Sequence, residues 1–170
     1  MADTKSPDAI ALLKADHDKV AGLFESFEKA SGESRKQTIA EEICLELTVH
    51  AAIEEEIFYP ACEGKVEEDL LKEAYVEHDG AKVLIAEIEA GSPSDEYYDA
   101  KVRVLGEQIE HHVEEEEARM EGLFAQARKT GLDMDALGEQ MAARKAELIA
   151  SYEKSGLPKP ELTTMSATPA

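Results

Sequence analysis

Four long segments of this chain repeat apolar residues at helical spacing, and in each of them one position of the repeat is filled by histidine. In the first segment Ile10, Leu13, Val20 and Phe24 are three or four residues apart except at one gap, which His17 fills. Such spacing places these side chains on one face of an α-helix. The chain therefore has to fold into helices whose shared interior accommodates imidazole groups.

The three other segments follow the same pattern, and their apolar faces contain His50, His78 and His112. Short stretches rich in Gly, Ser and Pro separate the segments, and these residue types favour turns. We expect helices over residues 7–30, 35–62, 66–90 and 95–129.

The composition and the short turns together define the expected fold. Aromatic residues make up only 5% of the chain and Trp is absent, whereas helix-favouring residues are abundant. We therefore expect an all-α protein, an antiparallel up-down-up-down four-helix bundle over residues 1–130. A weaker apolar repeat after Asp133 predicts an additional C-terminal helix within residues 131–155. Residues 156–170 are rich in Pro, Ser and Thr, and we expect them to be disordered.

The charge of the chain excludes several classes of partner. It contains 38 Asp and Glu against 18 Lys and Arg, a formal net charge of −20. A surface this acidic repels nucleic-acid phosphates and anionic lipids, so we expect neither a nucleic-acid nor a membrane partner. The first residues lack the features of a signal peptide, which predicts a cytoplasmic protein. Cys44 and Cys62 would lie about 27 Å apart on one helix, too far apart for a disulfide.

The placement of four histidines on four apolar faces is the strongest functional signal in the sequence. Such a face covers two to three positions in seven, so four independent histidines would all reach it by chance only about 1 to 3% of the time. They also lie at similar depth, roughly 12 to 17 residues from a common end of the expected bundle, a spread near 7 Å. The pattern predicts one layer of imidazoles across the interior.

Two glutamates extend this layer. Glu54 and Glu116 each follow a histidine by four residues and therefore point the same way from their helices. A buried carboxylate costs several kcal/mol unless it is paired or binds a metal. Four imidazoles and two carboxylates suffice for two metal ions if the carboxylates bridge them, and a donor set without thiolate favours iron over zinc or manganese. We expect the metal ligands to be His17, His50, Glu54, His78, His112 and Glu116.

The pair His112 and Glu116 has an alternative one residue earlier, because His111 also precedes a glutamate, Glu115, by four residues. The apolar face of this segment continues to His112 and not to His111, so we expect His111 to flank the site or to support it from outside. The other acidic residues near these positions are expected to form a solvated surface without chemistry: Glu55, Glu56, Glu114 and Glu117.

These motifs resemble those of hemerythrin-like proteins of the HHE cation-binding group, over residues 8–129. The residues that carry the resemblance are Lys14 to His17, His50 to Pro60, Glu77 with His78, and His111 to Glu116. The resemblance implies an antiparallel four-helix bundle around a di-iron centre bridged by oxide or hydroxide. It further implies roles in O2 binding, sensing, iron handling, or peroxide and NO chemistry.

The chain departs from the oxygen-carrying members of that group at two positions. In the third helix those proteins have a second histidine four residues after the first, and this chain has Lys82 there. In the fourth helix they have an aspartate five residues after the histidine, and this chain has Glu117 there. A site with one imidazole fewer would be more open to water or oxidant, so the resemblance does not extend to reversible O2 carriage.

Two functional hypotheses follow. The first is a non-haem di-iron protein that binds O2 or a related small oxidant, as a sensor, a store or a redox enzyme; the sequence has no catalytic acid–base pair that distinguishes these roles. The alternative is an iron-sensing or scaffolding bundle in which the metal is structural and the surface binds a protein partner. The chain has no Gly-rich phosphate loop and no nucleophile motif, which excludes those classes of enzyme.

Overall fold

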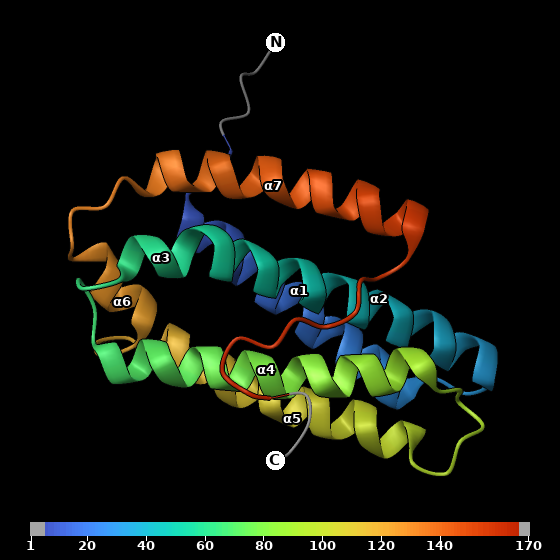
Figure 1. Ribbon diagram of the computed structural model, residues 1–170. Coiled ribbons are helices and arrows are strands. Elements are labelled where there is room, and N and C mark those ends of the chain that lie inside the picture. Colours follow the sequence, from blue (N-terminus) through green and yellow to red (C-terminus); the bar gives the residue numbers. More distant parts are fainter. Residues whose placement is uncertain (1–5, 167–170) are drawn as a thin grey trace.

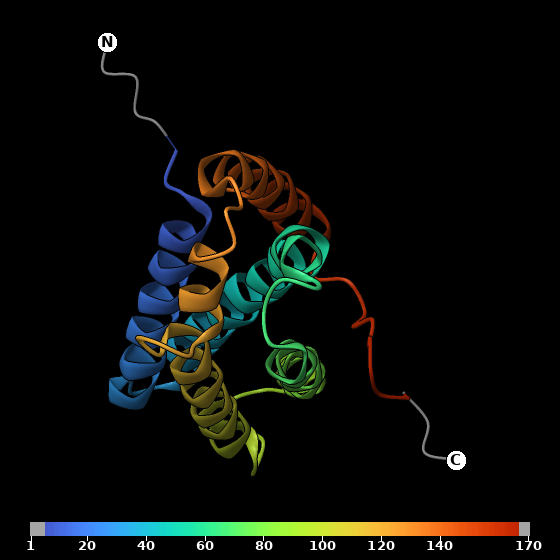
Figure 2. The same cartoon turned by 90° about the vertical axis from the view of Figure 1, so that its left-hand side faces the viewer.

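The computed structural model describes residues 6–166, and within this range the chain is helical, with no strand. Its elements are α1 (Ala9–Lys29), α2 (Glu33–Ile53), the π-helix η1 (Glu54–Phe58), α3 (Tyr59–Cys62), α4 (Glu68–Ala90), α5 (Tyr98–Glu117), α6 (Leu123–Arg128) and α7 (Met134–Ser155). The long helices α1, α2, α4 and α5 run antiparallel to their neighbours (Figures 1 and 2). The expected all-α four-helix bundle is confirmed. No helix of the described chain is both long enough and apolar enough to cross a membrane.

The sequence predicted one continuous α-helix for the second long segment, but the structure contains a π-helix within it. After α2 the chain forms the π-helix η1, in which the Tyr59 amide donates to the Glu54 carbonyl, and then returns to α-helix in α3. Pro60 provides the reason, because it has no amide hydrogen to donate and its ring crowds the preceding turn of an α-helix. Widening the helix just before Pro60 relieves this conflict and turns the following residues toward the interior.

The fourth long segment is interrupted, where the sequence predicted a helix to residue 129. Helix α5 ends at Glu117, and α6 begins only at Leu123. The turn between them is tight: a Cβ at Gly122 would lie 2.5 Å from the Ala118 carbonyl oxygen. Leu123 and Phe124 on α6 are buried, so this short helix closes one end of the bundle.

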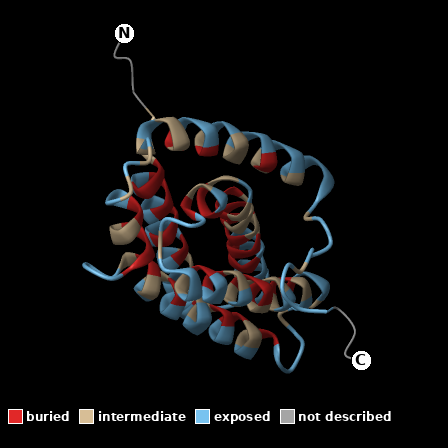
Figure 3. Ribbon diagram, turned by 60° about the vertical axis from the view of Figure 1, so that its left-hand side comes forward, coloured by how far each residue is buried: buried red, intermediate tan, exposed pale blue. Residues whose placement is uncertain are grey.

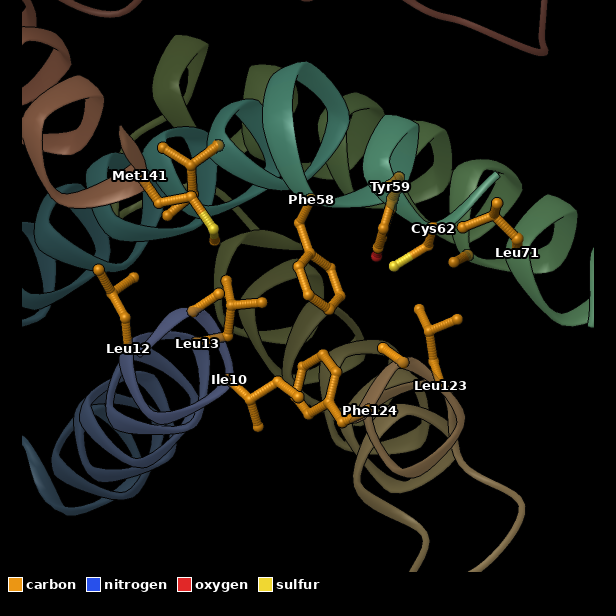
Figure 4. Close-up of a cluster of buried hydrophobic side chains, with 14 of the residues drawn as sticks. Ile10, Leu12, Leu13, Phe58, Tyr59, Cys62, Leu71, Leu123, Phe124 and Met141 are labelled. Carbon is orange, nitrogen blue, oxygen red and sulfur yellow. The ribbon is translucent and has the colours of Figure 1, made fainter. Parts of the chain in front are cut away.

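The bundle interior consists of two apolar clusters with a polar layer between them. One cluster lies toward α3, α6 and α7 (Figure 4), where Phe58 meets Phe124 edge to face with ring centroids 5.6 Å apart. The other lies toward the opposite end and includes Val20, Ile43 and Leu105. Figure 3 shows the buried residues on the inward faces of the helices. The four inward histidines occupy the layer between these clusters.

Helix α7 forms where the sequence predicted an additional helix, whereas the segment after it differs from what the sequence suggested. Helix α7 begins after Asp133, whose carboxylate accepts from the Ala136 amide, and it packs on α1 and α2 with Met141 fully buried. Residues 156–166 were predicted to be disordered, but this segment lies along the bundle and its Thr163 and Thr164 amides donate to Asp79 on α4. Residues 167–170 lie outside the described range.

The substitution Gly138→Ala is expected to destabilise the protein by about 1 to 3 kcal/mol, because overpacking a close contact forces the backbone apart. A Cβ at this position of α7 would lie 2.3 Å from the Pro7 carbonyl oxygen and 2.8 Å from the Ala9 nitrogen. The matched control is Gly22→Ala on α1, where nothing lies within 4 Å of the added carbon. That change should stabilise the protein by about 0.5 to 1 kcal/mol through helix propensity. Chemical denaturation checks both values, and equal effects of the two substitutions would contradict the packing of α7.

Candidate metal centre

The six side chains selected from the sequence meet in the middle of the bundle. They come from α1, α2, η1, α4 and α5, and each residue is at most 6% exposed. These six side chains form two groups that could each hold a metal ion, and the ligand atoms within each group lie within 4.8 Å of one another. The first group contains His17, His50, Glu54 and Glu116, and the second contains Glu54, His78 and His112. The groups share Glu54, so they are two halves of one site.

The histidines form two pairs. The Nε2 atoms of His17 and His50 are 3.1 Å apart, and those of His78 and His112 are 3.2 Å apart. Two nitrogen ligands that lie about 2.1 Å from one metal ion, at right angles to each other, would be about 3.0 Å apart. Each pair therefore has the separation of neighbouring ligands on a single cation.

Each of the two glutamates reaches both histidine pairs. The Glu54 Oε1 atom lies 3.3 Å from His50 Nε2, and its Oε2 atom lies 3.1 Å from His78 Nε2. The Glu116 Oε2 atom lies 3.2 Å from His17 Nε2, and its Oε1 atom lies 3.4 Å from His112 Nε2. Glu54 Oε1 and Glu116 Oε2 are buried and accept no hydrogen bond. Carboxylates placed in this way could bridge two cations, one at each pair.

The outer nitrogens of the four imidazoles each face a carboxylate. The contacts are His17 Nδ1 with Glu117 (3.0 Å), His50 Nδ1 with Asp16 (3.2 Å), His78 Nδ1 with Glu55 (2.9 Å) and His112 Nδ1 with Glu77 (2.5 Å). An ionised carboxylate only accepts hydrogen bonds, so each Nδ1 donates, and an Nε2 that carries no proton turns its lone pair inward. Lone pairs facing each other at about 3 Å need a cation or a proton between them. The donor set thus fits bound metal, and these carboxylates orient the ligands.

The charges of the site favour positive ions. Burial favours the neutral form of the His50 imidazole, but the Glu54 and Asp16 carboxylates outweigh burial and raise its pKa to about 10. Burial and the Glu54 charge oppose ionisation of Glu116, yet His112 and His17 lower its pKa to about 2. The interior therefore keeps its carboxylates ionised beside positive charge, which protons on the imidazoles or bound cations supply.

Tyr59 is a part of the site that the sequence did not reveal. Its hydroxyl lies 2.7 Å from Glu116 Oε1 and 3.0 Å from Glu54 Oε2, and it is 3.2 Å from His78 Nε2. In an α-helix, residue 59 would lie roughly 140° around from residue 54. The π-helix η1 instead places Tyr59 about one turn after Glu54 on the same side. The only signal in the sequence is Pro60, which disfavours a regular α-helix in the turn before it.

His111 and Lys82 lie outside this cluster. The His111 side chain is 64% exposed, and its Nε2 lies 3.2 Å from Glu115 on the surface. The Lys82 ammonium lies 2.9 Å from Glu55 Oε2 and 3.0 Å from the Glu161 carbonyl oxygen. The structure thus brings His112 and not His111 to the cluster. Lys82 pairs with Glu55, the carboxylate that accepts from His78 Nδ1.

The expectation that Glu55 and Glu117 belong to a solvated surface was wrong. Both side chains are partly buried, and each accepts from an imidazole Nδ1. Each directly follows an inward glutamate, and in both cases the histidine it contacts belongs to the neighbouring helix. The pattern of a single helix does not show such a contact.

Comparisons with known proteins agree with a helical domain of a cation-binding family. Residues 8–124 match the sequence model of the family described as "Hemerythrin HHE cation binding domain". A solved structure of an HHE cation-binding domain-containing protein from Mycobacterium kansasii has a similar fold, with a TM-score of 0.73 and 23% identity, covering 89% of this chain and 95% of that one. A curated relative, the DNA nickase of Nostoc sp. (strain PCC 7120), is 33% identical over 109 residues. The match covers 64% of this chain but 31% of the relative, about a third of its length.

Proposed function

Because the chain belongs to the hemerythrin HHE cation-binding domain family, we propose that it is a non-haem di-iron protein that binds O2 or a related small oxidant. The observation that carries this proposal is the placement of Glu54 and Glu116, each of which reaches both histidine pairs with its two oxygens. Two cations, one held by each histidine pair and with both carboxylates within reach, would account for this arrangement, whereas a single cation would leave one histidine pair without a partner.

The residues divide naturally between the two ions. His17 and His50 would hold one ion, His78 and His112 the other, and both carboxylates would be shared. The Tyr59 hydroxyl could provide a further oxygen beside the second pair. Imidazole and carboxylate without thiolate suit iron, and neither cysteine belongs to the ligand groups found in the described chain. When bound, an iron pair supplies the capacity to bind or reduce a small oxidant.

The surrounding side chains have defined tasks in this function. The four carboxylates at the Nδ1 atoms fix the ring orientations and strengthen the imidazoles as ligands. Phe124 stacks on the His17 ring with centroids 5.7 Å apart and an interplanar angle of 9°. Together with the apolar cluster behind it, this ring excludes water from one side of the layer.

Metal content and spectroscopy test the proposal. Protein expressed with ample iron should contain about two iron atoms per chain and should show charge-transfer absorption in the near ultraviolet. The spectrum of the reduced protein should change on exposure to O2, peroxide or NO. Iron content near zero would refute the proposal, and an iron spectrum insensitive to all three oxidants would favour the alternative of a structural metal in a scaffolding bundle.

The substitution Glu117→Ala is expected to lower iron affinity by about 10- to 100-fold, because it removes the acceptor that orients His17. The matched control is Glu114→Ala, which removes an exposed carboxylate from the same acidic run and should leave the affinity unchanged. Equilibrium competition with a ferrous chelator measures both. Equal affinities of the two variants would show that Glu117 does not support the site.

The nicking activity named for the Nostoc relative is not part of this proposal. That relative is about three times as long as the matched region, and the present chain has a net charge of −20, which opposes contact with DNA phosphates. If the iron-loaded protein nicked supercoiled plasmid, nicking would have to be included in the proposed function.

A further inference from the structure

A chamber of about 750 Å³ lies directly beside the histidine layer. It extends between α2 and α4 and is bounded on one side by residues 157–161. Side chains of all four inward histidines reach its wall. The chamber therefore connects the candidate metal centre with the segment that follows α7.

The wall of this chamber is mainly apolar away from the histidines. Its apolar side chains include Val20, Leu47, Ile85, Ile109 and Leu157. A water molecule needs two to four polar partners to be held in a cavity, and these residues offer none. The volume also lies within the range of about 300 to 1,000 Å³ typical of small-molecule sites, far more than a diatomic oxidant needs.

Five acidic residues line the chamber, and three of them, Asp16, Glu55 and Glu56, have cationic partners. Glu56 forms two hydrogen bonds with the Arg144 guanidinium, and Asp16 is paired with Lys145. Glu55 is held by Lys82. An anion would meet a wall on which carboxylates outnumber ammonium groups. The charges of the wall therefore disfavour an anion, and its largely apolar side chains favour a neutral ligand.

The outer boundary of the chamber is held in place by a buried carboxylate. We call residues 157–165 the strap; it runs from the end of α7 along the outside of the bundle to α4 (Figures 1 and 2). Asp79 on α4 is 0% exposed. Its oxygens accept from the amides of Thr163 (2.9 Å), Thr164 (2.6 Å) and Met165 (2.9 Å) and from the Thr164 hydroxyl (2.7 Å). Detaching the strap would break all four hydrogen bonds, so the strap is a fixed outer wall of the chamber.

We propose that this chamber binds a neutral, largely apolar organic molecule between the histidine layer and the strap. The inference goes beyond the proposed function, because binding depends on the walls and not on the metal. The ligand would lie against the histidine layer at one end and against Leu157 and Pro158 at the other.

A matched pair of fluorescent probes tests the chemistry. N-phenyl-1-naphthylamine is neutral, and 1-anilinonaphthalene-8-sulfonate has the same aromatic body with one negative charge. The full-length protein should bind one molecule of the neutral probe per chain, with at least tenfold weaker binding of the sulfonate. Equal binding of both probes, or no binding of the neutral one, would overturn the proposal.

Variants locate the binding site. The half-buried Ala86 lines the chamber, so Ala86→Phe should weaken binding of the neutral probe at least tenfold. The control Ala100→Phe places the same ring at an exposed position of α5 and should have no effect. Equal effects of the two substitutions would place the probe elsewhere and refute the chamber as its site.

The role of the strap needs a separate variant. Asp79→Ala should release residues 157–165, seen as faster cleavage after Glu161 by endoproteinase Glu-C, and should weaken neutral-probe binding several-fold. Faster cleavage with unchanged binding would refute the strap as a wall. Iron content of the unaltered protein, expressed with ample iron, separates this proposal from the previous one. If that protein contains no iron but still binds the neutral probe, the metal proposal is refuted and the chamber is supported.

Discussion

The variant His112→Ala is expected to retain at most half of the iron of the unaltered protein, whereas His111→Ala should retain nearly all of it. Adjacent residues of a helix point about 100° apart, so only one of the two imidazoles can face the bundle interior. His112 is buried with its Nε2 3.2 Å from that of His78, and the His111 side chain is 64% exposed.

Iron content per chain, measured on both purified variants, checks this expectation. Circular dichroism and the melting temperature of each variant show whether the bundle is intact. Loss of iron from His111→Ala together with full retention in His112→Ala would reverse the assignment and would move the carboxylate ligand from Glu116 to Glu115.

Helical periodicity was sufficient to predict the long helices, because each buries a continuous face. Helix α1 covers Ala9–Lys29 against an expectation of 7–30, and α4 covers Glu68–Ala90 against 66–90. The π-helix η1 and the break after Glu117 were missed. Both depend on backbone details, the missing amide hydrogen of Pro60 and the tight turn before Leu123, which the spacing of apolar residues does not report.

The inward residues of the site could be predicted for the same reason, since periodicity specifies which side chains face the axis. The four supporting carboxylates could not be predicted, because each contacts the histidine of a neighbouring helix. Asp16 of α1 contacts α2, Glu55 of η1 contacts α4, Glu77 of α4 contacts α5, and Glu117 of α5 contacts α1. Each lies next to an inward residue, on its N-terminal or C-terminal side. Which side faces the neighbour depends on how the helices are arranged around the bundle axis, and the pattern of a single helix does not contain that information.

Removing the metal is expected to lower the melting temperature on the order of 10 °C. A ligand present at a thousand times its dissociation constant stabilises the folded state by about 4 kcal/mol. For a chain of this size each kcal/mol shifts the melting temperature by about 2 to 4 °C. The physical cause is the buried negative charge of Glu54 and Glu116, two of whose oxygens accept no hydrogen bond from the protein.

Calorimetry of iron-loaded and chelator-treated protein measures this difference, and Glu54→Gln tests its origin. The amide keeps the size of the side chain but carries no charge and cannot bridge two cations as a carboxylate does, so most of the difference between loaded and metal-free protein should disappear. The control Glu114→Gln alters an exposed carboxylate and should preserve the full difference. Because binding and folding are linked, the loss in melting temperature should also shrink as the free iron concentration of the loaded sample is reduced. Identical melting temperatures for loaded and metal-free protein would mean that Glu54 and Glu116 do not hold a cation.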